Sequence, residues 1–413
     1  MGFDIRTVAE DEFEAWQTTN SVAFFSHIPP DTGSRWKRPF VDLDRCWAAF
    51  DNGRPVATLR SFGNEITVPG GAQVAADAVT NVAVLPTHRR RGSLNGMMSA
   101  SLAQAAERGD PVSILIAARW LIYGRYGYGP ATEGASYTVS TEGFALRPEV
   151  ARLAGTGSIE IVKPAELRAQ VDAIFDRFRA GQVGAIKRQP ELVDRTLGLN
   201  VGPPGFEPPK GYCALRRDTE GRPDGYLHYD VDDAWQGMQP DCTLTVHDLV
   251  AATPAAYAAL WAFCAEMDNV VRVKAADRSV DEPLRWLLQD GRAMTRDHQD
   301  DMVWLRILDV AKALSARSYR VAGALVVQVT DPHGHAEGRY LLDGGPDGAS
   351  CSRTDAPADL TLPAYALGAA YVGGTRLRNL ASGGGVTEHT PGALSRADLM
   401  FLSEVTPWCN TWF

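Results

Sequence analysis

Cysteine is scarce in this sequence of 413 residues, and its six cysteines are scattered without a CxxC pair. Zinc sites and disulfide frameworks need regularly spaced cysteines, so we expect neither, nor any other metal cofactor. Unpaired cysteines suit a reducing compartment, which makes the cytoplasm the expected location. No apolar run approaches the roughly 20 residues of a membrane-spanning helix. The first ten residues carry acidic side chains and no apolar segment, which argues against a signal peptide.

A basic excess is also lacking, because 41 Lys and Arg residues face 50 Asp and Glu residues, giving a formal net charge of −9. Proteins that bind nucleic acid usually present a basic face, so we expect neither a nucleic-acid partner nor a membrane partner. The mild acidic excess favours a cationic substrate only weakly. Hydrophobic residues make up 45% of the chain, enough to fill several cores, and the length predicts two to three domains.

Short apolar runs that end at turn residues predict the strands of a first domain at residues 46–50, 55–62, 79–84 and 112–116. Helical spacing of apolar residues predicts a helix over residues 93–107, between the last two strands. A strand, a helix and a strand in this order make a right-handed crossover, so the two strands should pair in parallel. Similar elements follow from residue 158 to residue 275, which suggests a diverged internal duplication.

The strand at residues 79–84 leads through a proline into the basic loop Arg89-Arg90-Arg91-Gly92, and a helix begins at once. Free N–H groups at a helix N-terminus attract anions, and the helix dipole adds to this attraction. Gly92 lets the backbone approach a ligand closely, and Arg90 and Arg91 add charge, so the loop can hold a pyrophosphate. The alternative interpretation is a solvated basic turn. The loop has neither the Gly-Lys-Ser/Thr of a Walker loop nor the glycines of a dinucleotide fingerprint.

Two motifs carry a family resemblance. Arg89, Gly92 and Leu94 resemble the coenzyme A signature Q/R-x-x-G-x-G/A of GNAT acetyltransferases, with Leu94 in place of the usual small residue. The run V-A-V-L-P-T-H-R-R-R-G and the later run I-Y-G-R-Y-G-Y-G-P-A-T together resemble one GNAT branch, the Eis (enhanced intracellular survival) N-acetyltransferases. The resemblance extends in outline over the whole chain.

The resemblance implies an α/β fold with mixed, α+β-type sheets, divided into three domains. Residues 1–145 would form a GNAT domain with the acetyl-CoA site, and residues 146–300 a second, degenerate GNAT-like domain. Residues 301–413 would form a sterol-carrier-like domain that delivers the C-terminal carboxylate. The second domain has no R-x-x-G loop after its strand at residues 244–249, so we expect no cofactor there. By resemblance the protein would also be a homo-oligomer, namely a hexamer.

The family's cofactor and catalytic positions map onto this sequence one by one. Acetyl-CoA would be bound by Val82, Ala83, Val84, Arg90, Arg91, Gly92, Ser93, Leu94, Asn95, Ala118 and Arg119. Tyr123 matches the general acid that protonates the leaving thiolate, and the α-carboxylate of Phe413 matches the general base. A tyrosine packed among aromatic neighbours and a hydrophobic plug at the chain end are the structural alternatives.

Phe24, Ser26, Trp36 and Trp412 match the positions that bind the amine acceptor. The aromatic residues could pack on a substrate or attract a cation. Known members of the family carry acids near Ser26 and at the penultimate position, where this chain has Trp412. The acceptor classes to consider are aminoglycosides, lysine side chains, polyamines and arylalkylamines, and the absence of the two acids favours a smaller or more apolar amine, such as a lysine side chain or an arylalkylamine. A lipid or sterol carrier and a catalytically inert coenzyme A-binding scaffold are the competing hypotheses.

Overall fold

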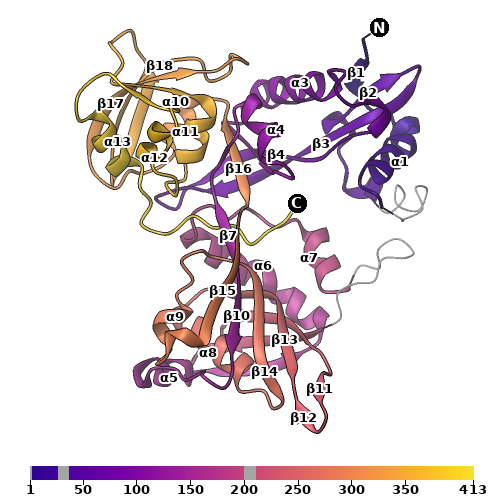
Figure 1. The fold of residues 1–413 in the computed structure, drawn as a ribbon, viewed down its shortest axis with the longest axis vertical. Coiled ribbons are helices and arrows are strands. Elements are labelled where there is room, and N and C mark those ends of the chain that lie inside the picture. Colours follow the sequence, from indigo (N-terminus) through magenta and orange to yellow (C-terminus); the bar gives the residue numbers. More distant parts are fainter. Residues whose placement is uncertain (1, 27–36, 200–210) are drawn as a thin grey trace.

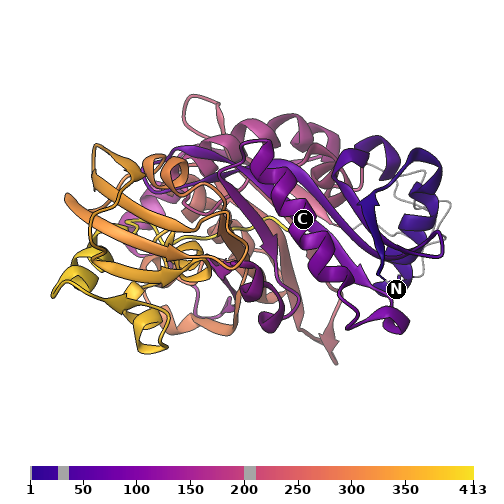
Figure 2. The same cartoon turned by 90° about the horizontal axis from the view of Figure 1, so that it is seen from above.

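Three large β-sheets, each with its own helices, and one two-stranded hairpin make up the described part of the chain (Figures 1 and 2). The computed structural model describes residues 2–26, 37–199 and 211–413. The two seven-stranded sheets lie one above the other in Figure 1, and a five-stranded sheet lies beside the upper one. This arrangement confirms the mixed α/β fold class.

The first sheet has the strand order β1-β2-β3-β4-β5-β16-β6. Its strands are β1 (Asp4–Thr7), β2 (Cys46–Asp51), β3 (Arg54–Thr67), β4 (Gln73–Val84), β5 (Val112–Ile116), β16 (Val303–Ile307) and β6 (Gly129–Pro130). Helix α3 (Ser93–Glu107) connects β4 to β5, which pair in parallel as predicted. Helix α1 (Phe13–Ala23), which the sequence pattern did not reveal, packs on β3 and β4.

The second sheet has the order β15-β7-β14-β13-β10-β9-β8. Its strands are β7 (Glu133–Ser140), β8 (Ser158–Val162), β9 (Tyr212–Arg217), β10 (Pro223–Val231), β13 (Cys242–Ala251), β14 (Val270–Arg278) and β15 (Met294–Asp301), and the hairpin β11 (Trp235–Gln236) with β12 (Gln239–Pro240) projects from it. Its helices are α5 (Pro148–Ala154), α6 (Pro164–Gly181), α7 (Pro190–Thr196), α8 (Pro254–Ala265) and α9 (Leu284–Leu287). Strands β13 and β14 pair in parallel around α8, as β4 and β5 do around α3, so the duplication is confirmed.

The two large sheets exchange a strand. Strand β7 follows the first sheet in the chain but pairs with β14 and β15, whereas β16 follows the second sheet and pairs with β5 and β6. The colours of Figure 1 show a purple β7 in the lower sheet and an orange β16 in the upper one. Strand β7 thus lies before residue 145 but belongs to the second sheet, and β16 lies after residue 300 but belongs to the first. Each exchanged strand covers a parallel strand that would otherwise be left with an unpaired edge.

The third sheet, in the order β19-β18-β17-β20-β21, shares a continuous core with the first. Its strands are β17 (Gly323–Thr330), β18 (Gly338–Gly345), β19 (Gly348–Arg353), β20 (Leu360–Pro363) and β21 (Thr387–Glu388). Its helices are α10 (Val310–Ser315), α11 (Ala364–Ala370), α12 (Leu377–Ser382) and α13 (Ala393–Phe401). Arg306 of β16 forms a fully buried ion pair with Asp331 at 2.7 Å, which ties the third sheet to the first.

The chain end returns from α13 to the junction of the two large sheets (Figure 1). Trp408 and Cys409 are buried there, and the Trp408 N–H donates to the Val183 carbonyl at 2.9 Å. The chain end is therefore docked at this junction through Trp408 and Cys409. Within the described ranges, no helix has the length and apolar character needed to cross a membrane.

Candidate active site

The candidate site begins where β4 and β5 separate. Their parallel pairing starts at Ala76 with Val112 and ends at Val79 with Leu115, yet β4 continues to Val84. Beyond Val79, the edge of β4 that faces β5 has no strand partner in the described part of the chain. The backbone groups within Val82–Val84 that point to this edge are therefore available to a ligand that enters between the strands, apart from the Val84 carbonyl, which accepts a hydrogen bond from Arg89 Nε at 3.4 Å.

A buried polar network fixes a bulge in β4 at this point. Asn81 adopts a positive φ of 54°, and the pairing register with β3 shifts beside it. The Asn81 carbonyl accepts hydrogen bonds from Thr58 Oγ1 at 2.8 Å and from Asn20 Nδ2 at 3.3 Å. Asn20 and Thr58 are almost fully buried, so both donors are held rigidly. Through Asn81, this network sets the direction of the backbone at Val82.

The N-terminus of α3 lies directly after this strand and carries no internal cap. Gly92 is the N-cap residue with φ 90°, and no side chain bonds the first turn. The N–H groups of Ser93, Leu94 and Asn95 have no acceptor among the described residues, which is the expected state of an uncapped first turn. A β-carbon added at Gly92 would meet no atom within 4 Å, so the space in front of the helix is open.

The arginines of the loop differ in their contacts. Arg90, with φ 62°, is exposed and forms no ion pair with any described residue. Arg91 lies 3.5 Å from the Asp51 carboxylate and above the Phe3 ring. Arg90 is thus the cation that stands free beside the α3 N-terminus, whereas Arg91 is attached to the β2–β3 hairpin.

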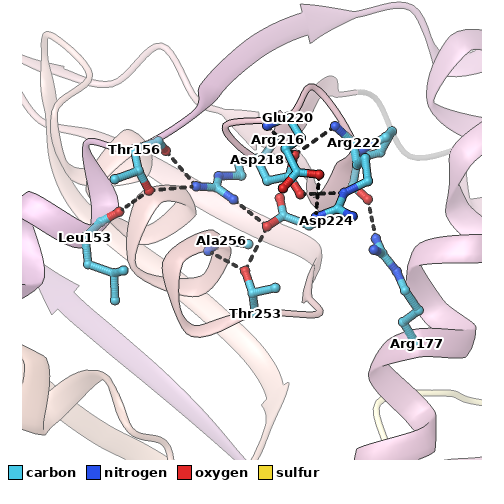
Figure 3. Close-up of polar contacts among 11 residues, drawn as sticks. Leu153, Thr156, Arg177, Arg216, Asp218, Glu220, Arg222, Asp224, Thr253 and Ala256 are labelled. Atoms are coloured by element: carbon cyan, nitrogen blue, oxygen red, sulfur yellow. Dashed lines mark hydrogen bonds and ion pairs between the residues drawn. The ribbon is translucent and has the colours of Figure 1, made fainter.

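The corresponding helix of the second sheet, α8, has an N-terminus that is already occupied (Figure 3). Thr253 caps it by accepting a hydrogen bond from the Ala256 N–H at 3.1 Å, and its hydroxyl donates to Asp224 Oδ2 at 2.8 Å. Asp224 in turn forms a buried ion pair with Arg216, which also bonds the Thr156 carbonyl. An internal carboxylate therefore lies where the first domain leaves an open anion site.

Tyr123 ends the short helix α4 (Trp120–Tyr123) and is buried at 6% exposure. It belongs to the hydrophobic cluster of Val79 and Leu115, and Val82 packs at the edge of that cluster. Burial, with a smaller contribution from Tyr126, raises the pKa of Tyr123 to about 12. Its phenol is therefore protonated throughout the physiological pH range.

The glycines around Tyr123 have a structural reason. At Gly127, with φ 80°, an added β-carbon would lie 2.0 Å from the Arg306 guanidinium. At Gly129 it would lie 2.0 Å from the Tyr365 carbonyl of α11. The Tyr-Gly-rich motif therefore permits close packing against β16 and the third sheet, and only part of it is available for chemistry.

A cavity of about 250 Å³ opens beside the β4 bulge. Thr80 and Asn81 line it from β4, and Trp412 and Phe413 line it from the chain end. The remaining lining residues are Lys37, Phe40, Arg60, Phe62, Gln189, Glu191, Leu192 and Arg195. The structure thus brings the C-terminal residue against the same strand that runs on to Val82, although the two are more than 300 residues apart in sequence.

The C-terminal tail is anchored by the second domain. Arg188 pairs with Asp248 and bonds Thr411 Oγ1 at 3.2 Å and the Asn410 carbonyl at 3.4 Å. Trp412 Nε1 donates to Asp277 Oδ2 at 2.8 Å, and the Phe413 ring packs edge-on against Phe62 at 5.8 Å. These contacts fix the position of the chain terminus at the cavity.

The other predicted site residues are less closely gathered. Phe24 is 53% exposed and does not line this cavity, and Ser26 bonds the Ser21 carbonyl through its N–H. Ala118 and Arg119 are exposed between β5 and α4. Trp36 lies outside the described residues.

Sequence reasoning missed Lys37, Arg60 and Arg195, which lie just before Arg38, in β3 and in α7, respectively. Arg60 is a charged side chain in the middle of a largely buried strand, a signal that could have been noticed. Asn in a β-branched strand could likewise have indicated a positive φ. In the described part of the chain, no group of three or more His, Cys, Asp and Glu side chains is placed to hold a metal ion.

Comparisons with known proteins agree with this architecture. Residues 4–131 and residues 184–307 each match a model described as "Acetyltransferase (GNAT) domain", and residues 310–410 match "Sterol carrier protein domain". An uncharacterized N-acetyltransferase of Streptomyces avermitilis is 39% identical, with 99% of this chain and 98% of that protein covered. The N-acetyltransferase Eis of Mycobacterium tuberculosis is 32% identical, with 96% of each chain covered.

Solved structures give the same result. Eis1 from Mycobacterium abscessus is similar with a TM-score of 0.86 and 31% identity, and the match covers 99% of this chain and 100% of that one. A GCN5-related N-acetyltransferase from Anabaena variabilis shares the fold with a TM-score of 0.84 at 20% identity, and the match covers 100% of both chains. The chain therefore belongs to the Eis-like family of GNAT N-acetyltransferases.

Proposed function

We propose that this enzyme transfers the acetyl group of acetyl-CoA directly to a primary amine held in the cavity beside β4. One observation carries the proposal: an open, uncapped anion site at the α3 N-terminus follows a strand whose bulge faces a cavity containing the chain terminus. The capped N-terminus of α8 supports a single cofactor site, in the first domain.

The residues of the first domain fit coenzyme A. The free N–H groups of Ser93, Leu94 and Asn95 would bind its pyrophosphate, and the open space at Gly92 would admit it. Arg90 would add an unpaired positive charge, and Arg91 could contribute by exchanging its contact with Asp51. Ala118 and Arg119 would lie beside the remaining part of coenzyme A. When bound, acetyl-CoA supplies the activated acetyl thioester.

The edge of β4 would orient and polarise the acetyl group. A backbone N–H at Val82, Ala83 or Val84 would donate to the carbonyl oxygen, which gains negative charge as the amine nitrogen attacks the carbonyl carbon. The bulge network of Asn20, Thr58 and Asn81 would hold this donor in place before the reaction. The C–S bond then breaks, and its electron pair leaves on sulfur.

Tyr123 would act on the leaving sulfur as the general acid. A phenol with a pKa of about 12 is a weaker acid than a thiol of pKa about 8.5, so full proton transfer before bond breaking would be unfavourable. We therefore propose that Tyr123 donates a hydrogen bond as sulfur becomes negative and releases its proton only late in the step. Tyr123 is afterwards reprotonated from water.

The amine must lose one proton to water before it attacks, because an ammonium nitrogen has no lone pair. The α-carboxylate of Phe413 would orient the neutral amine and accept the second proton, which the nitrogen loses as the N–C bond forms. Trp412 would line the acceptor end of the cavity. Phe24, Ser26 and Trp36 remain candidate acceptor contacts by family resemblance.

The acceptor belongs to the primary amines: an aminoglycoside, a lysine side chain, a polyamine or an arylalkylamine. The cavity volume of about 250 Å³ is below the roughly 300–1,000 Å³ typical of sites for drug-sized ligands. This favours a small acceptor, or the end of a long one. The family resemblance also leads us to propose a cytoplasmic homohexamer, which light scattering on the purified protein would test.

Thiol release from acetyl-CoA in the presence of an amine panel tests the proposed function. Release that depends on the amine, with an acetylated product of matching mass, is the expected result. Tight coenzyme A binding without release for any amine would favour the inert scaffold, and lipid binding alone would favour the carrier. Tyr123→Phe should lower turnover far more than cofactor affinity, and equal losses would assign Tyr123 a packing role.

A further inference from the structure

The acceptor cavity is lined by more positive than negative side chains. Among the described lining residues, Lys37, Arg60 and Arg195 contribute three cations and Glu191 contributes an acidic side chain. The Phe413 carboxylate, which the proposed function places at the cavity, adds a second negative charge. A simple amine is protonated near neutral pH, so it would enter a site whose charges on balance repel it.

Arg60 has no carboxylate partner among the described residues. Its Nε atom is buried without a hydrogen bond, its Nη2 contacts the Phe40 carbonyl at 3.5 Å, and its guanidinium lies 5.4 Å from the Phe62 ring centre. No ion pair joins Arg60 to any carboxylate of the described residues, including that of Phe413. Charges withdrawn from water are usually paired, so the half-buried guanidinium of Arg60 beside a cavity favours an anion as its ligand.

Lys37 also forms no ion pair with a described carboxylate, and it lines the same cavity as Arg60. Burial, followed by the charges of Arg60 and Arg195, lowers the pKa of Lys37 to about 8. All three cations line the same cavity, and Lys37 is still largely protonated at neutral pH.

We propose that the physiological acceptor is an amine that also carries an anionic group, which Lys37 and Arg60 bind while the amine points toward β4 and Phe413. This inference rests on the proposed function and narrows its substrate class. The anion would neutralise the excess positive charge of the cavity and provide acceptors for the free donors of Arg60. Carboxylate, phosphate and phosphonate groups share this chemistry.

Three acceptors of equal chain length test the inference: pentylamine with a neutral end, cadaverine with a cationic end and 5-aminovalerate with an anionic end. We expect kcat/KM for 5-aminovalerate to exceed that for pentylamine by about tenfold or more, because a hydrogen bond to a charged group contributes about an order of magnitude in affinity. Cadaverine should be the poorest. The matching aminoalkylphosphonate is compared with 5-aminovalerate by kcat/KM. A higher value for the phosphonate points to a site for a doubly charged anion, and a lower value points to a carboxylate site.

Variants assign the preference to the cavity. Lys37→Gln and Arg60→Gln should each reduce the ratio of kcat/KM for 5-aminovalerate to kcat/KM for pentylamine, a ratio in which any general loss of activity by the variant cancels. Lys187→Gln is the matched control, since Lys187 is exposed and does not line the cavity. Thermal unfolding monitors each variant, and Lys37→Gln keeps the test valid if Arg60→Gln fails to fold.

The outcomes separate this inference from the function on which it rests. Equal turnover of all three amines, or a preference for the anionic end that survives in Lys37→Gln and Arg60→Gln, would overturn the inference and leave the acetyltransferase intact. If no amine of this series or of the wider panel is acetylated, the proposed function fails, and the inference fails with it.

Discussion

Removal of the indole of Trp408 should release the C-terminal tail and with it the proposed general base. The Trp408 side chain is 4% exposed, and its Nε1 donates to the Asp277 carbonyl at 2.8 Å. Its ring packs edge-on against Phe178 at 5.7 Å and under the Arg278 guanidinium at 4.9 Å. All three contacts join the tail to the second domain, so Trp408→Ala should weaken tail docking more than the sheets themselves.

The burial of the Trp408 side chain sets the expected size of the effect. Truncation of a buried Trp to Ala costs about 3–5 kcal/mol, and every 1.4 kcal/mol changes an equilibrium about tenfold. The docking equilibrium of the tail should therefore shift by about two to three orders of magnitude. The remaining tail contacts, at Arg188 and Cys409, still favour the docked state, so the loss of activity should be smaller than the full shift in docking. We expect acetyl transfer to fall by at least about tenfold, with coenzyme A affinity unchanged.

Three measurements check this prediction: thiol release, coenzyme A titration by calorimetry, and the rate at which carboxypeptidase removes Phe413. Trp286→Ala is the matched control, because Trp286 is 69% exposed and remote from the tail in sequence. The control should resemble the parent protein in all three. A Trp408→Ala protein that loses Phe413 rapidly to carboxypeptidase, yet transfers acetyl groups at the parent rate, would refute the proposed role of the chain end.

Three further predictions concern the other parts of the site and the fold. Arg90→Ala should weaken coenzyme A binding about tenfold, as measured by calorimetry, without lowering the melting temperature. The control Arg292→Ala, on the second domain, should change neither the affinity nor the melting temperature. A large loss of stability in Arg90→Ala would instead favour a structural role for Arg90. Asp224→Ala should lower the free energy of unfolding, measured in urea, by about 3–5 kcal/mol, because it leaves the buried guanidinium of Arg216 without a counter-charge. The double variant Arg216→Met with Asp224→Leu should recover most of that loss. No recovery would contradict the ion-pair explanation. The raised pKa of Tyr123 stabilises the folded state fully below pH 10, the pKa of an unfolded tyrosine, and this stability is lost as the pH rises toward 12. Between pH 10 and 12, the free energy of unfolding of the parent should therefore fall by about 2–3 kcal/mol more than that of Tyr123→Phe. Parallel losses in the two proteins would contradict the burial of the phenol.

The local elements of the first domain could be predicted because their signals are local. Helix α3 and strand β5 have the predicted bounds, since helical spacing and a short apolar run each define themselves within one segment. Strand β4 begins at Gln73, six positions before the predicted start at residue 79, because its first half contains alanines and an aspartate that do not read as a strand. Asp77 is nevertheless buried there, paired with Arg45 and Arg108.

The exchange of β7 and β16 could not be predicted from these patterns. Each strand reads as an ordinary apolar or alternating segment, and its choice of sheet depends on partners far away in sequence. The cation group of the cavity is hidden for the same reason, because Lys37, Arg60 and Arg195 meet only after the second domain has folded against the first. Tyr123 and Phe413 were assigned by resemblance, and their roles stay predictions.

The most direct test of the central claim compares two versions of the full chain that differ in one group. Semisynthesis can supply the protein with Phe413 as its α-carboxylate or as its α-carboxamide, which has similar size and no negative charge. We predict that the carboxamide protein binds coenzyme A normally and transfers acetyl groups at least about a hundredfold more slowly, the usual scale of a proton-transfer residue. Equal turnover by the two proteins would contradict the proposal that the chain end takes part in the reaction.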